Sequence, residues 1–466
     1  MIFEKVKSEG IAHNSYFVGS ISEAAVIDPR RDCDVYLELA KKYEIKITHI
    51  FETHRNEDYV IGSLELSNIV DAEIYHGAKL DFSYGNTATE GEKFDIGMLE
   101  LGIIETPGHT DESISITLKD KESSDSMHTV FTGDTLFSGD VGRTDLYGEA
   151  QRQRLARSMY NSLFNRILRL GDEIIVCPAH GAGSVCGGDI AGFEFTTIGF
   201  EKGNNRVLQN KDEESFVAYK MKERLERPPY FAKMEIYNKN GPPVLSKLPS
   251  PKALTVKEIK EQMKDGALIV DTRMPTAFAA GHISGSINIW KDGLPIFAGW
   301  MLSYDKPILI VKENDQSIDE ITRYLVRLGY DNIIGYLAKG FPTWYKNAER
   351  IGMIDEWTVR NLEEHKSDQT LFILDVRDEG NWQEGGHVEG ANHIYVGHLV
   401  EHLKEVPRNK KVCVVCDPGF KTGVAASVLK INGYENVTSV LGGMAAWKKA
   451  GYRIEREQSS TSISKN

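Results

Sequence analysis

The second half of the chain contains an internal repeat, and this repeat constrains the fold more than any other feature of the sequence. Two similar blocks read LIVDTRMPTAFAAGHISGSINI and FILDVRDEGNWQEGGHVEGANHI, with Asp271 and Asp375 at equivalent positions 104 residues apart. Each block alternates short apolar runs with amphipathic stretches, a pattern typical of parallel strands connected by helices. We therefore expect two small α/β domains of one fold, over residues 252–350 and 356–457.

The repeated motifs resemble those of the rhodanese family. They are Asp-x-Arg after a strand, Gly-His-x-x-Gly, and a glycine, Gly340 or Gly443, before a helix that contains an aromatic residue. Rhodaneses place a reactive cysteine on a loop after the central strand, and the second block has Cys416 there, directly after the apolar run KVCVV. The first block has Lys312 at the matching place. It therefore resembles a rhodanese domain that lacks the catalytic cysteine, a pseudo-rhodanese.

The rhodanese resemblance implies that Cys416 carries a persulfide. Backbone N–H groups of its loop and the N-terminus of the next helix are expected to lower the cysteine pKa. Lys421 adds a cation where rhodaneses commonly have arginine, and a lysine cannot grip an anion through two parallel hydrogen bonds. Cys413 is expected to be a buried strand cysteine. The other residues expected in the persulfide loop are Asp417, Gly419, Phe420 and Thr422.

Four apolar runs in the first 240 residues lead directly to a side chain that can bind a metal. ITHIFET leads to His54, LGIIETPG to His109, TVFTG to Asp134 and EIIVCPA to His180. Buried imidazoles and carboxylates are costly unless they are paired or bind a metal, and strand ends on one rim of a sheet converge. We therefore expect residues 1–240 to form a domain of their own with a metal site at a sheet rim.

The order of these motifs resembles the metallo-β-lactamase superfamily. The matching segments are THRNEDY, TPGHT, TGDTLF and PAHG. The resemblance implies an α/β fold in which a metallo-β-lactamase-type αββα sandwich is followed by the two rhodanese-like α/β domains. Hydrolases of this superfamily with two metals carry His-x-His-x-Asp-His, whereas this chain has Asn56 and Tyr59 at the second and last histidine positions. A second metal site has therefore lost strong ligands, although Asp58 and His180 remain.

The ligand set that remains is His54, His109 and Asp134. Two imidazoles and one carboxylate are typical of non-heme iron(II) oxygenases with open coordination positions. The pattern is similar to the persulfide dioxygenases, which hold one Fe²⁺ per chain and oxidise the terminal sulfur of a thiol persulfide to sulfite. GRTDL resembles a segment of that branch, and its Arg143 and Asp145 either support the site or pin a turn. Asp58, Tyr59 and His180 are expected to lie near this site. They either orient ligands or contact substrate, or they have a purely structural role.

Together the resemblances imply a fusion that acts in sulfide detoxification. Its front domain would oxidise a low-molecular-weight thiol persulfide with O2 to sulfite, and Cys416 would transfer sulfane sulfur to sulfite and give thiosulfate. The family also implies a homo-oligomer. Two alternatives stay open: a glyoxalase-II-like thioester hydrolase fused to a sulfurtransferase, and a non-enzymatic sulfur carrier or sensor. Cys33 and Cys186 are expected to serve packing or to lie incidentally at the surface.

The composition excludes several other classes of protein. A formal charge of −13 and the lack of a dense Lys/Arg run oppose nucleic-acid binding. No apolar run approaches the ~20 residues that span a bilayer, and the first residues lack the pattern of a secretory signal. Five cysteines in 466 residues do not make a disulfide framework. We expect a cytoplasmic protein that binds neither nucleic acid nor membrane.

Overall fold

The computed structural model describes residues 1–124 and 126–456, and the chain divides into two compact units. The first unit is Met1–Leu248 together with Val326–Gly329, and the rest of the chain forms the second. The domain limits expected at residues 240, 252, 350 and 356 are finer than this division and stay predictions. The limit expected at residue 457 lies outside the described residues.

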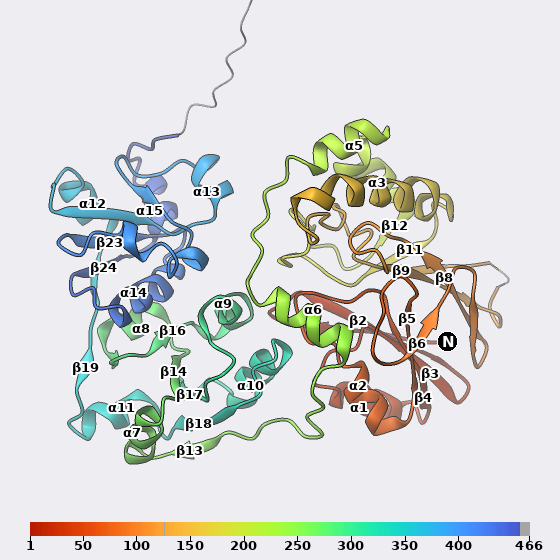
Figure 1. Ribbon diagram of the computed structural model, residues 1–466, viewed down its shortest axis with the longest axis horizontal. Coiled ribbons are helices and arrows are strands. Elements are labelled where there is room, and N and C mark those ends of the chain that lie inside the picture. Colours follow the sequence, from red (N-terminus) through yellow and green to blue (C-terminus); the bar gives the residue numbers. More distant parts are fainter. Residues whose placement is uncertain (125, 457–466) are drawn as a thin grey trace, which may run out of the picture. The chain divides into compact units, whose positions relative to one another are not determined.

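Two six-stranded sheets form the centre of the first unit (Figure 1). The first sheet has the order β1-β2-β3-β4-β5-β6, and the second has the order β12-β11-β10-β9-β8-β7. Strands β1 to β6 are Ile2–Ser8, His13–Ser20, Glu23–Ile27, Lys46–Glu52, Glu73–Gly77 and Asn86–Ala88. Strands β7 to β12 are Lys93–Ile96, Leu99–Glu105, Ile114–Asp120, Thr129–Gly133, Ile175–Pro178 and Thr196–Thr197. Helices α1 to α6 are Asp34–Lys42, Ser63–Val70, Glu149–Asn165, Ile198–Asn204, Glu213–Lys220 and Phe231–Asn240.

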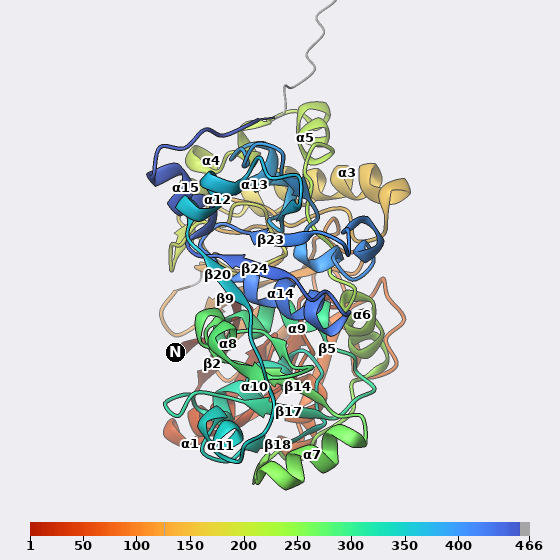
Figure 2. The same cartoon turned by 90° about the vertical axis from the view of Figure 1, so that its left-hand side faces the viewer.

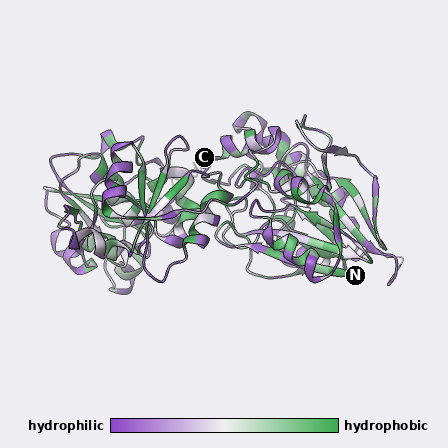
Figure 3. Ribbon diagram, turned by 90° about the horizontal axis from the view of Figure 1, so that it is seen from below, coloured by the Kyte–Doolittle hydropathy of each residue, from purple (hydrophilic) through white to green (hydrophobic). Residues whose placement is uncertain are grey.

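Apolar side chains on both faces of each sheet explain the layering of this unit. The inner faces pack on each other through a core that includes Phe51 and Phe131. The outer face of the first sheet is covered by α1 and α2, which contribute Tyr36 and Leu66 to a second core. The outer face of the second sheet is covered by α3, α4 and α5. Figure 3 shows hydrophobic strands between helices with hydrophilic outer surfaces. The expected αββα sandwich is confirmed.

Two five-stranded sheets form the second unit, and their topologies are identical. The orders are β13-β18-β17-β14-β16 and β20-β24-β23-β21-β22, and every strand pair in both sheets is parallel (Figure 2). The strands of the first sheet are β13 Lys252–Leu254, β14 Leu268–Asp271, β16 Ile287–Asn288, β17 Ile308–Val311 and β18 Ile333–Leu337. Those of the second are β20 Asp355–Trp357, β21 Leu371–Asp375, β22 Asn392–His393, β23 Lys411–Val415 and β24 Val437–Val440. The repeat seen in the sequence is therefore confirmed as a repeat of structure.

Helices connect the parallel strands in both repeats, as this topology requires. A small additional sheet pairs β15 His282–Ile283 with β19 Ile351–Gly352. Helices α7 to α11 of the first repeat are Val256–Lys264, Pro275–Ala280, Leu294–Met301, Ile318–Arg327 and Phe341–Lys346. Helices α12 to α15 of the second are Val359–His365, Glu379–Gln383, Lys421–Ile431 and Gly443–Lys449.

The repeated Asp-x-Arg motif forms the same buried ion pair in both domains. Arg273 Nη2 lies 2.6 Å from Asp271 Oδ2, and Arg377 Nη2 lies 2.7 Å from Asp375 Oδ2. The same nitrogen also donates to the carbonyl oxygen of the glycine before the motif histidine, at 2.8 Å in the first repeat and 2.9 Å in the second. Each pair thus ties the end of a central strand to the Gly-His-x-x-Gly segment, which explains why both motifs occur together.

Candidate functional site

Four strand ends of the first unit bring the expected metal-binding side chains together. His54 follows β4, His109 lies between β8 and β9, Asp134 follows β10 and His180 follows β11, and all four are buried. Asp134 Oδ2 lies 3.4 Å from His109 Nε2 and 3.7 Å from His54 Nε2. His180 Nδ1 donates a 2.7 Å hydrogen bond to the other oxygen of Asp134. The four residues that the sequence predicts to meet therefore do converge.

The arrangement fits a metal ion. His54 Nε2, His109 Nε2 and Asp134 Oδ2 are buried and have no hydrogen-bond partner among the described residues. Buried polar atoms without a partner cost free energy, and coordination to a cation satisfies their lone pairs. A set of two imidazole nitrogens and one carboxylate oxygen suits Fe²⁺ or Zn²⁺.

Hydrogen bonds on the far side of each histidine ring leave the Nε2 atoms free to bind. His54 Nδ1 lies 2.9 Å from Thr53 Oγ1, and that hydroxyl donates to Asp28 Oδ2 at 2.7 Å. His109 Nδ1 donates to the carbonyl oxygen of Arg143 at 3.0 Å. With Nδ1 as the donor, Nε2 of each ring faces the cluster, and its lone pair becomes available to a metal that displaces any proton there.

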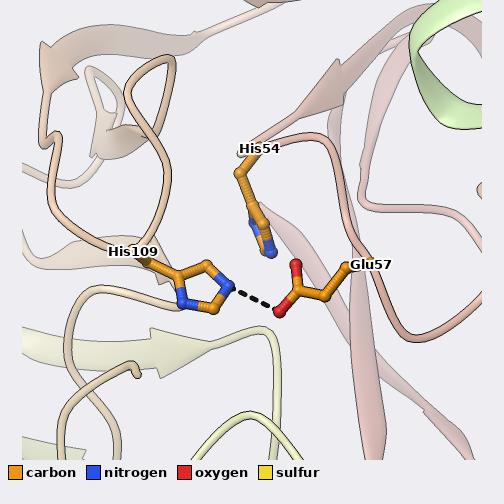
Figure 4. A group of neighbouring side chains, drawn as sticks. All are labelled: His54, Glu57 and His109. Atoms are coloured by element: carbon orange, nitrogen blue, oxygen red, sulfur yellow. Dashed lines mark ion pairs between the residues drawn. The ribbon is translucent and has the colours of Figure 1, made fainter. Parts of the chain in front are cut away.

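Glu57 also lies in this cluster, and the sequence analysis missed it. Its Oε1 lies 3.0 Å from His109 Nε2, and its carboxylate faces both histidines (Figure 4). Burial would raise the pKa of Glu57, but the charges of His109 and His54 outweigh burial and lower it. Burial likewise opposes protonation of His109, but the carboxylates of Glu57 and Asp134 raise the pKa of His109 to about 9. The cluster therefore contains two imidazoles and two carboxylates.

The segment that carries Glu57 is fastened by α6. Asn238 Nδ2 donates to the carbonyl oxygens of Asn56 and Tyr59 at 2.6 and 2.8 Å, and its Oδ1 accepts from the Ile61 N–H at 3.0 Å. The Tyr59 ring packs 4.2 Å from the ring of His13. The side chain of Asn56 donates back to the carbonyl of the first histidine of the motif. Of the residues that replace the superfamily histidines, Asn56 thus contacts its own loop and Tyr59 packs on β2.

Arg143 and Asp145 form an ion pair, and the backbone of Arg143 also contacts the His109 ring. The guanidinium binds the Asp145 carboxylate through two hydrogen bonds of 2.7 and 2.9 Å. It also donates to the carbonyl oxygens of Val185 and Glu226, at 3.1 and 3.0 Å. The side chain therefore pins surrounding loops, while the Arg143 carbonyl holds the His109 ring.

Cys33 and Cys186 of the first unit lie in different surroundings. Cys33 packs in the core beneath the first sheet, as one of its expected roles requires. Cys186 is fully buried, and its Sγ lies 3.6 Å from Glu57 Oε1. Of the two placements expected for Cys186, packing or the surface, the structure shows the buried one, because the loop after β11 brings the thiol next to Glu57.

Cys416 follows β23 on the loop that the sequence predicts. The Gly419 N–H donates to Cys416 Sγ at 3.2 Å, and a Cβ on Gly443 would lie 1.8 Å from the Cys416 carbonyl oxygen, so only glycine fits there. Burial raises the pKa of the Cys416 thiol, while the loop N–H groups and Lys421 lower it, and burial is the larger effect. The expected depression of this pKa is therefore wrong for the free thiol, because the sequence does not reveal that the side chain is completely buried.

The other residues of the persulfide loop shape its surface. Lys421 Nζ lies 3.4 Å from Asp378 Oδ2, and Thr422 Oγ1 donates to the Gly419 carbonyl at 2.7 Å. The ring of Phe420 stacks on Trp290 of the first repeat at 5.3 Å. The carbonyl of Asp417 accepts from the helix that begins at Gly443. Cys413 is confirmed as a buried strand cysteine, and burial raises its pKa to about 12.

In the first repeat, the loop that corresponds to the Cys416 loop surrounds a cation instead of a sulfur. Lys312 Nζ donates to the carbonyl oxygens of Glu313 and Gln316 at 3.0 and 2.7 Å. In this loop backbone carbonyl oxygens face the Lys312 ammonium group. In the second repeat, a backbone N–H group faces the sulfur of Cys416 instead. This loop is unsuited to hold an anionic persulfide.

No helix within residues 1–124 and 126–456 has the length and apolar character needed to cross a membrane.

Family comparisons agree with the architecture. Residues 9–180 match the metallo-beta-lactamase superfamily, and residues 255–347 and 356–450 each match the rhodanese-like domain. A crystal structure of a metallo-beta-lactamase from Staphylococcus aureus subsp. aureus COL superposes with a TM-score of 0.63 and 28% identity, covering 72% of this chain and 99% of that one.

Curated relatives match the front part of the chain. The persulfide dioxygenase ETHE1 of Mus musculus is 28% identical over 34% of this chain and 59% of its own length. A hydroxyacylglutathione hydrolase of Dictyostelium discoideum is 30% identical over 34% of this chain and 57% of its own length. Other relatives are matched over 46% of their length, so the chain spans about half the length of such proteins. The chain therefore joins one domain that matches the metallo-beta-lactamase superfamily to two domains that match the rhodanese-like domain.

Proposed function

We propose that this protein oxidises thiol persulfides and then makes thiosulfate. In the first reaction, a thiol persulfide, O2 and water give the free thiol, sulfite and two protons. In the second, sulfane sulfur from another persulfide passes through Cys416 to sulfite. The observation that carries the proposal is the convergence of unpartnered, buried atoms of His54, His109 and Asp134 in a chain that also holds Cys416 on a rhodanese loop.

The front domain would hold one Fe²⁺ on His54, His109 and Asp134, and the ion would supply the activation of O2. The chain's own residues orient the site. Thr53 and the Arg143 carbonyl fix the two rings. Glu57 is held ionised, and its Oε2 is buried without a partner among the described residues, so it would orient a persulfide by accepting a hydrogen bond from the S–H group.

The rhodanese step uses Cys416 as a nucleophile. Its thiolate attacks the outer sulfur of a persulfide, the S–S bond to the carrier breaks, and the carrier thiolate leaves. Sulfite then attacks the outer sulfur on Cys416 and departs as thiosulfate, which regenerates the thiolate. The Gly419 N–H stabilises negative charge on sulfur, and Lys421 supplies a cation for the sulfite anion.

The two reactions would be separable by mutation. Cys416→Ser should abolish thiosulfate formation and retain O2 uptake and sulfite release. His109→Ala should lose iron and O2 uptake and retain sulfur transfer to added sulfite. Cys413→Ala, a buried cysteine outside the loop, is the matched control and should retain both. Loss of O2 uptake in Cys416→Ser, with iron still bound, would contradict the separation.

A thioester hydrolase is the competing function for the front domain, because hydroxyacylglutathione hydrolases are among the relatives of the chain. Asn56 and Tyr59 oppose it, since neither is a strong ligand for the second metal of such hydrolases. Cleavage of a glutathione thioester by the zinc-loaded protein, together with no O2 uptake by the iron-loaded protein, would favour the hydrolase.

A further inference from the structure

We propose that Arg327, which lies within the first rhodanese-like match, is a positioning residue for the metal site of the front domain. Residues 255–347 match the rhodanese-like domain, yet Val326–Gly329 belong to the first compact unit. This short segment contains the end of α10 and contacts the loop that runs from His54 to Ile61. The inference rests on the proposed function, and it concerns what holds the metal-binding loop in place.

The Arg327 guanidinium forms a buried ion pair within the first unit. Its Nε and Nη2 atoms donate to the two carboxylate oxygens of Asp32, at 2.9 and 2.8 Å, and both side chains are buried. Its Nη1 atom donates to the carbonyl oxygen of Glu9 at 3.1 Å. Arg30 Nε also lies 3.3 Å from Asp32 Oδ2. Two parallel hydrogen bonds to one carboxylate fix both the position and the orientation of the Arg327 side chain.

The backbone of the same segment contacts the metal-binding loop directly. The Val60 N–H donates to the Arg327 carbonyl oxygen at 2.8 Å. Arg31, which precedes Asp32 in the chain, donates through Nη1 to the Val326 carbonyl oxygen at 3.3 Å. The segment therefore links the residues that follow β3 to the loop that follows β4.

Arg327 and Asn238 hold the same stretch of this loop. Asn238 binds the carbonyl oxygen of Tyr59 and the N–H of Ile61, and Arg327 binds the N–H of the residue between them. Three consecutive residues are thus fixed through their backbone groups. Because Glu57 lies two residues before this stretch, release of the stretch would loosen the backbone that presents the Glu57 carboxylate to the metal cluster.

Gly329 allows the segment to pack closely against the loop. Its φ of 81° is a left-handed conformation, which favours glycine just after a helix. A Cβ at this position would lie 3.3 Å from Val60 Cγ2 and 3.3 Å from Met234 Cε. Met234 belongs to α6, the helix that also carries Asn238. The segment therefore packs on both the metal-binding loop and the helix that fastens it.

The test uses the full chain and the variant Arg327→Met. We expect Fe²⁺ affinity to fall roughly tenfold in a metal competition titration, because the loop behind the ligands is less well fixed. In the metal-free protein, hydrogen exchange at the amides of Val60 and Ile61 should become about tenfold faster, because this stretch opens more readily. Sulfur transfer to added sulfite should be retained, since Cys416 lies in the second unit.

Arg323→Met is the matched control. Arg323 lies one turn earlier on α10 and donates to Asp319 of the same helix at 3.2 Å, so its loss should change either readout by less than about twofold. Arg327→Lys keeps the charge without the two parallel hydrogen bonds, and it should recover part of the lost affinity. In a double-mutant cycle with Asp32→Asn, the two losses should not add, because both changes break one ion pair.

Unchanged Fe²⁺ affinity and unchanged exchange at Val60 in Arg327→Met would overturn the proposal. An equal loss in Arg323→Met, or additive losses in the cycle, would also overturn it. If Arg327→Met does not fold, Asp32→Asn, which keeps the shape of its side chain, gives the same two readouts, and unchanged values there would refute the role. Neither readout uses O2. A tenfold loss of Fe²⁺ affinity in the variant, with no O2 uptake by the unmodified protein, would therefore refute only the dioxygenase proposal.

Discussion

Asn238 fastens the loop that follows His54 and carries Glu57. Its side chain is fully buried at the end of α6 and makes three hydrogen bonds, two from Nδ2 to carbonyl oxygens and one from a backbone N–H to Oδ1. Asn238→Ala leaves the carbonyls of Asn56 and Tyr59 and the N–H of Ile61 without these partners. The change therefore disturbs the segment on both sides of Glu57.

The magnitude follows from the number of groups left unpaired. Each buried backbone group without a partner costs about 1–3 kcal/mol. Water that enters the space left by the amide offers new hydrogen bonds to these groups and reduces the cost. We therefore expect the free energy of unfolding to fall by roughly 3 kcal/mol, which is near the lower end of the summed cost of three unpaired groups. Affinity for iron should fall with it, because the loop that carries Glu57 and follows His54 is no longer fixed.

Urea unfolding of the metal-free protein, followed for the first unit, measures the effect. Asn204→Ala is the matched control: its amide donates to the Phe200 carbonyl at an exposed position of α4 and should change the free energy of unfolding by less than about 0.5 kcal/mol. If the free energy of unfolding of Asn238→Ala fell by less than about 1 kcal/mol, the reasoning would be refuted. Three buried groups that lose their hydrogen-bond partners should cost more than this.

Three further predictions follow from other contacts. Thr53→Val removes the hydroxyl behind the first histidine and should weaken iron binding about 10–100-fold in a metal competition titration; unchanged affinity would show that this contact is dispensable. Arg377→Met leaves the buried aspartate of its motif uncompensated and should cost roughly 3–5 kcal/mol of unfolding free energy; a neutral result would contradict the pairing. Burial raises the pKa of Cys416, whereas Lys421 lowers it, so the rate of sulfur transfer should increase with pH with an inflection above the ordinary cysteine pKa of about 8.5. Lys421→Ala should move this inflection to higher pH. An inflection below about 8.5 in the unmodified protein would contradict this.

The sequence predicted those features of the fold and of the site that follow directly from a pattern of residues. The residues after four apolar runs were predicted to meet at a sheet rim, and His54, His109 and Asp134 do meet, although His54 comes from the first sheet and the other two from the second. A strict repeat implies a repeated topology, and Asp271 and Asp375 occupy equivalent strands.

Other features depend on backbone direction and burial, which the pattern does not show. The left-handed backbone at Asn56, with φ of 50°, lies directly before Glu57, and no periodicity indicates that its carboxylate faces the site. Cys186 enters through a long irregular loop whose path has no sequence signature. The raised pKa of Cys416 reflects complete burial, which a strand followed by a loop does not reveal.

The central claim is most directly tested by O2 consumption of the iron-loaded full chain on addition of a thiol persulfide, with sulfite and thiosulfate quantified in the same sample. The account predicts uptake in proportion to the persulfide oxidised, with thiosulfate formed only while Cys416 is intact. No uptake, with iron confirmed on the protein, would contradict it.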